Sequence, residues 1–505
     1  MNSPVVSSAE MRAVEEAALA RGIEVEALMD EAGAGVARTV RQFFPQPGPC
    51  IVYAGKGHNG GDALVAAESL QRAGWEIEIR LPFPEADCSE LTRKKLESLR
   101  RGKLPLVSGR AEARPSNLVI LDGLLGVGAK SLLREPVRAA AAEINRVRRQ
   151  QNAFVFAVDV PTGLDSDTGD IDPDCVTADF TVAIAFVKHG LIVDSALDFV
   201  GRIEIVPLAD LQSDDPLQAE PTVKPRAEAY PSGVMGTAGS LRHLIPRRKF
   251  SAYKNQFGRI GVVAGSKGFV GAAMMTANGA LRSGAGLVEL FVTDDIYEIA
   301  AAAAPPEVMV KSTRSYRDLG EEKIDVWAVG PGLGKASAAR IRDHIARSEQ
   351  PMVVDADGLN ILADEIDVLK RCRGPRLLTP HPGEMQRLLD SGKMSRAGIA
   401  RNFCEQFPVT LLLKGARTIV AQRGEPLSYN TTGNPGMATG GMGDVLTGVC
   451  AGLIGQGLPL YDAARVGAWL CGRAAEFAIF QGTASEQSLL PSDVLANLGR
   501  AFGEL

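Results

Sequence analysis

Short apolar segments that suit β-strands alternate with helical segments along most of this chain. Near the start, Met11, Val14 and Ala18 fall at helical spacing. Residues 75–81 alternate apolar with charged side chains, as a half-buried strand does. Such an alternation predicts an α/β fold in which a mainly parallel sheet carries helices on both faces. The other segments that we predict as strands in the first half are residues 50–54, 118–122, 154–159 and 180–186.

Two domains are expected, because 505 residues are more than one hydrophobic core usually serves. A second series of strands and helices begins at Arg259. Between the two series the chain loses its apolar period and becomes rich in Pro, Asp and Glu, as surface linkers do. We therefore predict an N-terminal domain over residues 1–215, a linker over 216–225 and a C-terminal domain over 226–505.

The net charge of −5 is too small to attract nucleic acid or an anionic membrane. The seven cysteines include no C-x-x-C pair and no zinc-like spacing, which is typical of reduced intracellular thiols. The sequence shows neither a signal-peptide pattern nor a long uninterrupted apolar run. We expect a cytoplasmic protein that binds small molecules, binds neither nucleic acid nor a membrane, and forms a homo-oligomer.

Three polar segments follow predicted strands in the first half, where ligands bind in open α/β sheets. Residues 55–62 are rich in glycine, which lets backbone N–H groups approach a phosphate. A tight turn with Asp62 as a helix N-cap would explain this segment equally well. Asp122 opens a second glycine loop, and Asp159 ends a third strand. The oxygen-bearing side chains that suit a hard cation here are those of Asn59, Asp122 and Thr162.

Four motifs, KGHNGGDA, LDGLLGVGAK, VDVPTGLDSDTG and VTADFTVAIAFVKHGL, together resemble the N-terminal domain of the bifunctional NAD(P)H-hydrate repair enzymes. The resemblance implies a Rossmann-like three-layer α/β/α domain that interconverts the C6 epimers of hydrated NADH or NADPH. It also implies potassium at Asn59, Asp122 and Thr162. Asp159 is our candidate for the group that passes a proton. The residues that the resemblance places against the substrate are His58, Asn59, Gly60, Gly61, Asp62, Gly126, Val127, Gly128, Ala129, Lys130, Ser131, Leu132 and Asp159. This sequence departs from the family at His58, where Asn is usual, and at Ala63, where Gly is usual.

The segment NTTGNPGMATGGMGDVLTG, residues 430–448, is a glycine-rich turn that leads into an apolar helix. Residues 440–443 can turn successive backbone N–H groups toward one point, and the helix N-terminus adds its positive dipole end. Such a loop would hold an anion. Asp444 is then either a helix N-cap or a base that takes the proton from a hydroxyl attacking phosphorus.

Seven motifs of the second half occur in the order of the ribokinase-like dehydratase domain of the same family. They are GSKGFVGAA, SGAGLVEL, GPGLG, DADGLN, TPHPGE, LKGART and GNPGMATGGMGD. The resemblance implies a ribokinase-like α/β/α domain in which Ala272, Gly332, His381 and Asp444 contact the hydrated nicotinamide nucleotide. The adenine nucleotide would contact Lys414, Gly415, Ala416, Arg417, Thr418 and Gly443, with Gly440 and Gly441 in the anion-binding turn. Met442 stands where the family usually has Thr.

The resemblance implies that Asp444 deprotonates the C6 hydroxyl, that ADP or ATP with magnesium phosphorylates it, and that elimination restores the reduced ring. The dehydratase acts on the S epimer, so a fused epimerase lets both epimers be repaired. The fused arrangement resembles bacterial members and favours ADP as donor. Two alternatives stay open: a small-alcohol kinase of the same fold with an N-terminal ligand-binding module, and an N-terminal half that is a non-catalytic interaction module.

Overall fold

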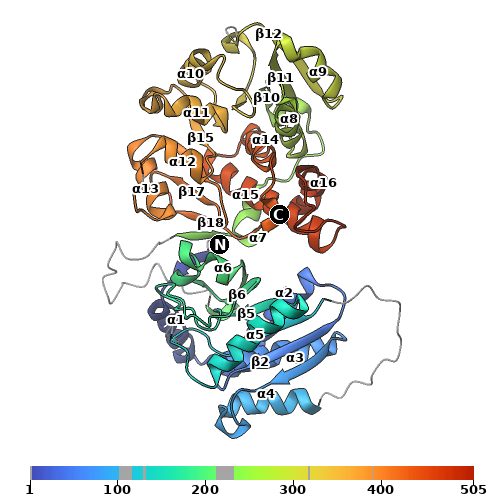
Figure 1. The fold of residues 1–505 in the computed structure, drawn as a ribbon, viewed down its shortest axis with the longest axis vertical. Coiled ribbons are helices and arrows are strands. Elements are labelled where there is room, and N and C mark those ends of the chain that lie inside the picture. Colours follow the sequence, from blue (N-terminus) through green and yellow to red (C-terminus); the bar gives the residue numbers. More distant parts are fainter. Residues whose placement is uncertain (1–2, 102–116, 129–131, 212–232, 317–318, 391) are drawn as a thin grey trace. The chain divides into compact units, whose positions relative to one another are not determined.

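A computed structural model describes residues 3–101, 117–128, 132–211, 233–316, 319–390 and 392–505. The chain divides into two compact units, Ser3–Ser232 and Gly233–Leu505, and each contains a sheet covered by helices (Figure 1). This α/β architecture is the one predicted from the sequence. The predicted linker over 216–225 lies outside the described residues, and the domain boundaries stay a prediction.

The sheet of the N-terminal unit is parallel throughout, with strand order β3-β2-β4-β5-β6-β8. All five segments predicted as strands in this half are present. Three short strands were not predicted: β8, and the pair β1 and β7, which are parallel to each other. The strands are β1 (Ser3–Val6), β2 (Pro49–Ala54), β3 (Glu76–Arg80), β4 (Val119–Gly123), β5 (Phe154–Val158), β6 (Phe180–Ile184), β7 (Val187–Lys188) and β8 (Arg202–Val206). The helices are α1 (Ser8–Ala20), α2 (Val25–Phe43), α3 (His58–Arg72), α4 (Glu90–Arg101), α5 (Val137–Gln151) and α6 (Leu197–Val200).

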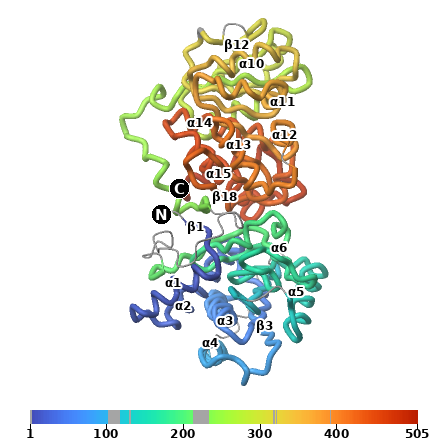
Figure 2. The backbone as a smooth tube through the Cα atoms, turned by 90° about the vertical axis from the view of Figure 1, so that its left-hand side faces the viewer, coloured from blue at the N-terminus to red at the C-terminus, as the bar shows by residue number. Residues whose placement is uncertain are grey.

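Both faces of this sheet are buried, because successive side chains of a strand point to opposite sides. On one face, Ile120 and Val155 belong to the apolar cluster that includes Ile144 of α5. On the other, the rings of Phe156 and Phe180 stack with centroids 4.4 Å apart, and Phe43 at the end of α2 packs against Phe180. Figure 2 shows α2 and α5 on opposite sides of the unit.

In the C-terminal unit the strands run in the order β12-β11-β10-β13-β14-β15-β16-β17-β18-β9. Neighbours from β12 to β16 are parallel, and β17 is antiparallel to both β16 and β18. The strands are β9 (Val234–Gly236), β10 (Arg259–Val263), β11 (Leu287–Thr293), β12 (Val308–Thr313), β13 (Val326–Val329), β14 (Met352–Val354), β15 (Arg376–Leu378), β16 (Thr410–Leu413), β17 (Ile419–Gln422) and β18 (Ser428–Asn430). The helices are α7 (Ala238–Leu241), α8 (Val270–Arg282), α9 (Tyr297–Ala303), α10 (Ala338–Arg347), α11 (Asp357–Ala363), α12 (Pro382–Leu388), α13 (Arg396–Gln406), α14 (Met442–Gly455), α15 (Leu460–Phe480) and α16 (Pro491–Phe502).

Helix α14 is buried along most of its length, because residues 445–454 are apolar or small on every side. Two glycines let it approach α8 closely. A Cβ atom on Gly448 would lie 2.0 Å from the carbonyl oxygen of Thr276, and one on Gly279 would lie 2.4 Å from that of Val445. This packing fixes the amino end of α14 in the C-terminal unit. Over the described part of the chain, no helix combines the length and apolarity that crossing a membrane requires.

Candidate active sites

In the N-terminal unit the loops after β2, β4 and β5 meet at the carboxyl ends of neighbouring parallel strands. Asp122, in β4, is fully buried. Its carboxylate accepts hydrogen bonds from the Thr162 hydroxyl at 2.7 Å and from the Thr162 backbone N–H at 2.8 Å. Burial raises the pKa of Asp122 to about 6, although the Thr162 hydrogen bonds oppose the shift. The structure thus brings together two of the three predicted cation ligands.

The third predicted ligand, Asn59, lies at the start of α3, and its Nδ2 donates to the carbonyl oxygen of Leu125 at 2.9 Å. The Leu125 N–H in turn donates to the Thr162 hydroxyl oxygen at 3.2 Å. Asn59, Asp122 and Thr162 therefore surround one loop. Helix α3 begins at His58 with Gly57 as its N-cap, so the alternative that makes Asp62 the N-cap is wrong.

Asp159 follows β5 in a left-handed backbone conformation, with φ of 66°. Such a φ is uncommon for residues other than glycine and is concentrated at functional sites. Its Oδ1 accepts a hydrogen bond from the Ile184 N–H at 3.0 Å and forms a short ion pair with Lys188. Lys188 is fully buried in β7 and also donates to the Ile184 carbonyl oxygen at 2.9 Å.

Two further carboxyl groups face this ion pair. Burial, followed by the charges of Asp159 and Glu15, raises the pKa of Asp62 well above its usual range. Burial and the Asp159 charge also raise the pKa of Glu15 on α1, which Lys188 opposes. Lys188 and Glu15 were not among the predicted site residues. Lys188 lies within the motif VTADFTVAIAFVKHGL, whereas no sequence signal marked Glu15.

The other predicted residues of this unit differ in their exposure. His58 is exposed at the start of α3. Ala63 is fully buried and faces the sheet, where a Cβ atom on Gly123 would lie 2.3 Å from the Ala63 Cβ. Its departure from the family is therefore a change in packing against β4. Gly60, Gly61, Gly126, Val127, Gly128 and Leu132 are described, and Leu132 is exposed. Ala129, Lys130 and Ser131 lie outside the described residues.

In the C-terminal unit, Lys414 stands at the end of β16 and reaches the loop after β14. Its ammonium donates to Asp355 Oδ1 at 2.7 Å, and the Thr447 hydroxyl donates to Asp355 Oδ2 at 2.8 Å. Glu384 Oε2 lies 3.8 Å from the Lys414 Nζ. Although burial acts to lower it, Asp355 and Glu384 raise the pKa of Lys414. Asp355, Glu384 and Thr447 were not predicted as site residues.

Asp444 lies in the first turn of α14, beside this ion pair. Helix α14 has Gly441 as its N-cap, with φ of 94°, so the alternative that makes Asp444 the N-cap is wrong. A Cβ atom on Gly443 would lie 3.1 Å from the Lys414 Nζ. Burial, followed by the charge of Asp355, raises the pKa of Asp444 to about 6. Two predicted segments, around Lys414 and Asp444, are thus adjacent.

Arg396, at the start of α13, binds the backbone of the loop 414–418. Its guanidinium donates to the carbonyl oxygen of Ala416 at 2.8 Å and to those of Lys414 and Arg417 at 3.3 Å each. One side chain therefore fixes the carbonyl side of the loop. Because these partners are backbone carbonyl groups, no side-chain pattern in the sequence pointed to Arg396.

The remaining predicted residues of this unit line neighbouring strand ends. His381 is the N-cap of α12, where Nδ1 accepts from the N–H groups of Gly383 and Glu384 at 3.0 and 3.3 Å. Two features therefore orient the imidazole: the hydrogen bonds of the helix cap and the prolines on either side of His381. Gly332 has φ of 63°, and a Cβ atom on it would lie 3.0 Å from the Ala272 Cβ.

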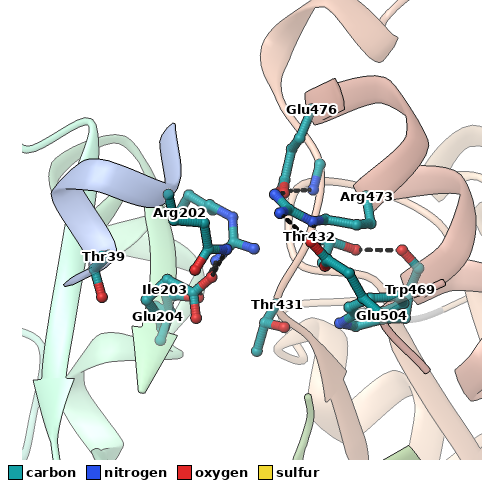
Figure 3. A network of polar contacts seen from close by, with 12 residues as sticks. Thr39, Arg202, Ile203, Glu204, Thr431, Thr432, Trp469, Arg473, Glu476 and Glu504 are labelled. Carbon is teal, nitrogen blue, oxygen red and sulfur yellow. Dashed lines mark hydrogen bonds and ion pairs between the residues drawn. The ribbon is translucent and has the colours of Figure 1, made fainter. Parts of the chain in front are cut away.

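The glycine-rich segment before α14 is tied to α15. Thr432 Oγ1 donates to the Trp469 carbonyl oxygen at 2.8 Å, and the Gly433 N–H donates to Glu476 Oε1 at 2.8 Å. Arg473, which is buried, pairs with Glu476 Oε2 at 2.9 Å and with Glu504 at 2.7 Å (Figure 3). These contacts hold the start of the segment that leads to Asp444.

Comparison with known proteins matches both halves. The family model described as YjeF-related protein N-terminus matches residues 25–190, and the model described as NAD(P)H-hydrate dehydratase matches residues 260–496. The bifunctional NAD(P)H-hydrate repair enzyme of Moorella thermoacetica is 36% identical over 93% of this chain and 90% of that protein. The enzyme of the same name from Escherichia coli is 31% identical over 97% of this chain and 92% of that protein.

Among solved structures, the ADP/ATP-dependent NAD(P)H-hydrate dehydratase of Bacillus subtilis is 27% identical and covers 53% of this chain and 97% of its own, with a TM-score of 0.47. The two family models follow the same order as the two units, and the relatives match over nearly the whole length. This chain therefore belongs to the family of bifunctional NAD(P)H-hydrate repair enzymes.

Proposed function

We propose that this enzyme repairs hydrated NADH and NADPH, and that Asp444 and Asp159 are the bases of its two reactions. The C-terminal unit dehydrates the S epimer at the expense of a nucleotide, and the N-terminal unit interconverts the two C6 epimers. One observation supports this proposal above the others. Asp444 lies in the first turn of α14, beside Gly443 and the Lys414 ammonium, where phosphoryl oxygens would be bound.

The dehydration would begin when Asp444 takes the proton of the C6 hydroxyl. The oxygen attacks the terminal phosphorus of the nucleotide, and AMP leaves if the donor is ADP. The C6–O bond then breaks with its electron pair going to phosphate, and loss of a proton from C5 restores the C5–C6 double bond. Phosphate is a far better leaving group than hydroxide, which explains the use of a nucleotide, bound as its magnesium complex.

The loop 414–418 is the proposed contact for the nucleotide phosphates. Lys414 supplies a cation, and Arg396 fixes the carbonyl groups of the loop on the other side. We also propose ADP as the preferred donor. Initial rates of dehydration with ADP and with ATP, each with magnesium, would test that preference directly.

The epimerisation would use Asp159. C6 carries both the hydroxyl and the ring nitrogen N1, so removal of the hydroxyl proton allows the C6–N1 bond to open. The electron pair goes to N1, which takes up a proton, and an aldehyde forms at C6. N1 then attacks the other face of the aldehyde and gives up its proton while the oxygen takes one up, which gives the other epimer. A single carboxylate at Asp159 can accept and return that proton.

Potassium fits the residues after β2, β4 and β5. The donors available are the amide oxygen of Asn59, the carboxylate of Asp122 and the hydroxyl of Thr162, which are all hard oxygen ligands. Among the described residues no cluster of His, Cys, Asp and Glu suits a transition metal. Bound potassium would balance the buried charge of Asp122. Its expected signature is thermal stabilisation by potassium over sodium, lost in Asp122→Asn.

The test of the two assignments uses purified S and R epimers, resolved by chromatography. Asp444→Asn should interconvert the epimers at the wild-type rate and yield no reduced cofactor. Asp159→Asn should dehydrate the S epimer at the wild-type rate and interconvert the epimers no faster than buffer. An Asp159→Asn protein that epimerises normally would show that the base lies elsewhere.

The small-alcohol kinase alternative is less well supported, because it leaves the matched N-terminal unit unexplained. A homo-oligomeric state and a cytoplasmic location remain predictions from the sequence. Light scattering during gel filtration would determine the first, and fractionation of cells that carry the protein would determine the second.

A further inference from the structure

Among the residues that the structure describes, the carboxylate of Asp159 is held through one of its two oxygens. The side-chain contacts of Asp159 with described residues, the Ile184 N–H at 3.0 Å and the Lys188 ammonium, both involve Oδ1. Lys188 is itself fixed by the Ile184 carbonyl oxygen at 2.9 Å. Because all these partners approach one oxygen, the other, Oδ2, is the one placed to take a proton from a ligand.

Lys188 cannot reach a ligand itself, because it is fully buried. It lies in β7, next to Val6 of the parallel strand β1. The segment that follows β1 is anchored over the loop after β5, where Ser8 N–H donates to Asp167 at 2.6 Å and the hydroxyls of Ser8 and Ser166 lie 2.7 Å apart. The N-terminal segment therefore encloses the lysine that binds Asp159.

The charges around Asp159 are mostly negative. Asp62 faces it from α3 and Glu15 from α1, where Arg12 and Glu16 act on Glu15 in turn. Lys188 is the cation in contact with Asp159 itself. A cation paired with a buried carboxylate offsets the cost of burying that charge beside other carboxyl groups.

We propose that Lys188 is a positioning residue for epimerisation, whose ammonium balances the charge of Asp159 and holds Oδ1 so that Oδ2 accepts the substrate proton. The inference rests on the proposed role of Asp159. The proposal gives a role to the lysine of the segment VKHGL, which is not among the residues predicted to contact the substrate.

The test measures kcat and KM for epimerisation by Lys188→Met, with the uncatalysed rate subtracted. Without the ammonium, Asp159 Oδ1 loses one of its two partners and Oδ2 is no longer held toward the substrate, so kcat should fall about a hundredfold while KM changes little. Lys188→Arg keeps a cation and should recover part of the loss. The control is Lys95→Met, since Lys95 is also a buried, ion-paired lysine of this unit but contacts Glu26 and Asp30 instead. Its kcat and KM should match the wild type.

A double mutant separates positioning from general damage. If Lys188 acts through Asp159, Lys188→Met should slow the Asp159→Asn protein no further. A rise in KM with an unchanged kcat in Lys188→Met, or an additive loss in the double mutant, would overturn the inference while leaving Asp159 as the base. Wild-type epimerisation by Asp159→Asn would instead overturn the proposed function. Thermal unfolding of each variant, and its dehydratase rate on the S epimer, would establish that both units are folded.

Discussion

The Lys414 ammonium donates to Asp355 Oδ1 at 2.7 Å, and this ion pair joins the loops after β16 and β14 beside the amino end of α14. Asp355 is buried, and its second oxygen is held by Thr447, one turn after Asp444 on the same helix. One carboxylate therefore holds both the proposed phosphate ligand and the helix that carries the proposed base. This relationship places the carboxyl ends of two strands beside the amino end of α14.

Thr447→Val should loosen this arrangement while keeping the shape of the side chain. The buried Asp355 loses a hydrogen-bond donor, which should lower the stability of the C-terminal unit by about 1–3 kcal/mol. The KM for the nucleotide should rise, because Lys414 is held less firmly. Denaturant unfolding and steady-state kinetics would measure the two effects. Thr447→Ser keeps the hydroxyl and should resemble the wild type. Equal losses in both variants would contradict the prediction.

The dehydratase should lose activity below about pH 6, because burial raises the pKa of Asp444 to about 6 and its protonated form cannot act as a base. The measurement is kcat/KM for the S epimer between pH 5 and 9. A rate that stays constant down to pH 5 would argue against Asp444 as the base.

The same shift has a consequence for stability. Folded Asp444 binds its proton more tightly than the unfolded chain does, so its contribution to stability is lost as pH rises from 3.8 toward about 6. Asp444→Asn should therefore raise the melting temperature at pH 7 and have little effect at pH 4. An equal effect at both pH values would contradict this interpretation.

Arg396→Ala should weaken nucleotide binding without changing the chemical step. The guanidinium donates to carbonyl groups of the loop 414–418, so its loss frees that loop, and the KM for ADP or ATP should rise about tenfold, the effect of one or two hydrogen bonds. kcat at saturating nucleotide should change much less. Arg401→Ala, an exposed residue on the same helix, is the matched control. A fall in kcat with an unchanged KM would show that Arg396 does not act through nucleotide binding.

Ala63 and Gly123 should behave as a packing pair. Gly123→Ala should destabilise the N-terminal unit, since its Cβ would lie 2.3 Å from that of Ala63. Adding Ala63→Gly should recover part of the loss, with the rest due to the backbone oxygens of Asn59 and Tyr53, 3.1 and 3.2 Å from the same position. Thermal unfolding of the single and double variants would test this. Strictly additive losses would contradict the proposed contact.

The fold was largely predictable because apolar runs alternate with helical periods. The strand-end rule led to Asp122 and Asp159, and the glycine-rich turn before α14 was recognised from its composition. The starts of the helices were harder. In α3 and α14 the glycines before the first acid already belong to the helix or its N-cap, so Asp62 and Asp444 lie inside the helices. The low helix propensity of glycine predicts that these glycines lie outside the helices, but packing in the folded protein keeps them in the first turns of α3 and α14.

Two partners of the site residues, Lys188 and Arg396, were not predictable. Lys188 meets Asp159 because β7 follows β6, which is the neighbour of β5 in the sheet, and its burial cannot be inferred from a sequence in which lysine usually marks the surface. Arg396 binds carbonyl groups, which every residue possesses. Asp355 follows the apolar run of residues 352–354 in the second series of strands and helices, and the strand-end rule applied there would have identified it.

We expect one chain to return both epimers of the hydrate to reduced cofactor at the expense of a nucleotide. The most direct measurement is recovery of dihydronicotinamide absorbance from an equal mixture of hydrate epimers, with ADP or ATP and magnesium. We predict complete recovery in two phases by the wild type, about half recovery by Asp159→Asn, as expected if only the S epimer reacts, and none by Asp444→Asn. Accumulation of a stable phosphorylated product without recovered absorbance would contradict the claim.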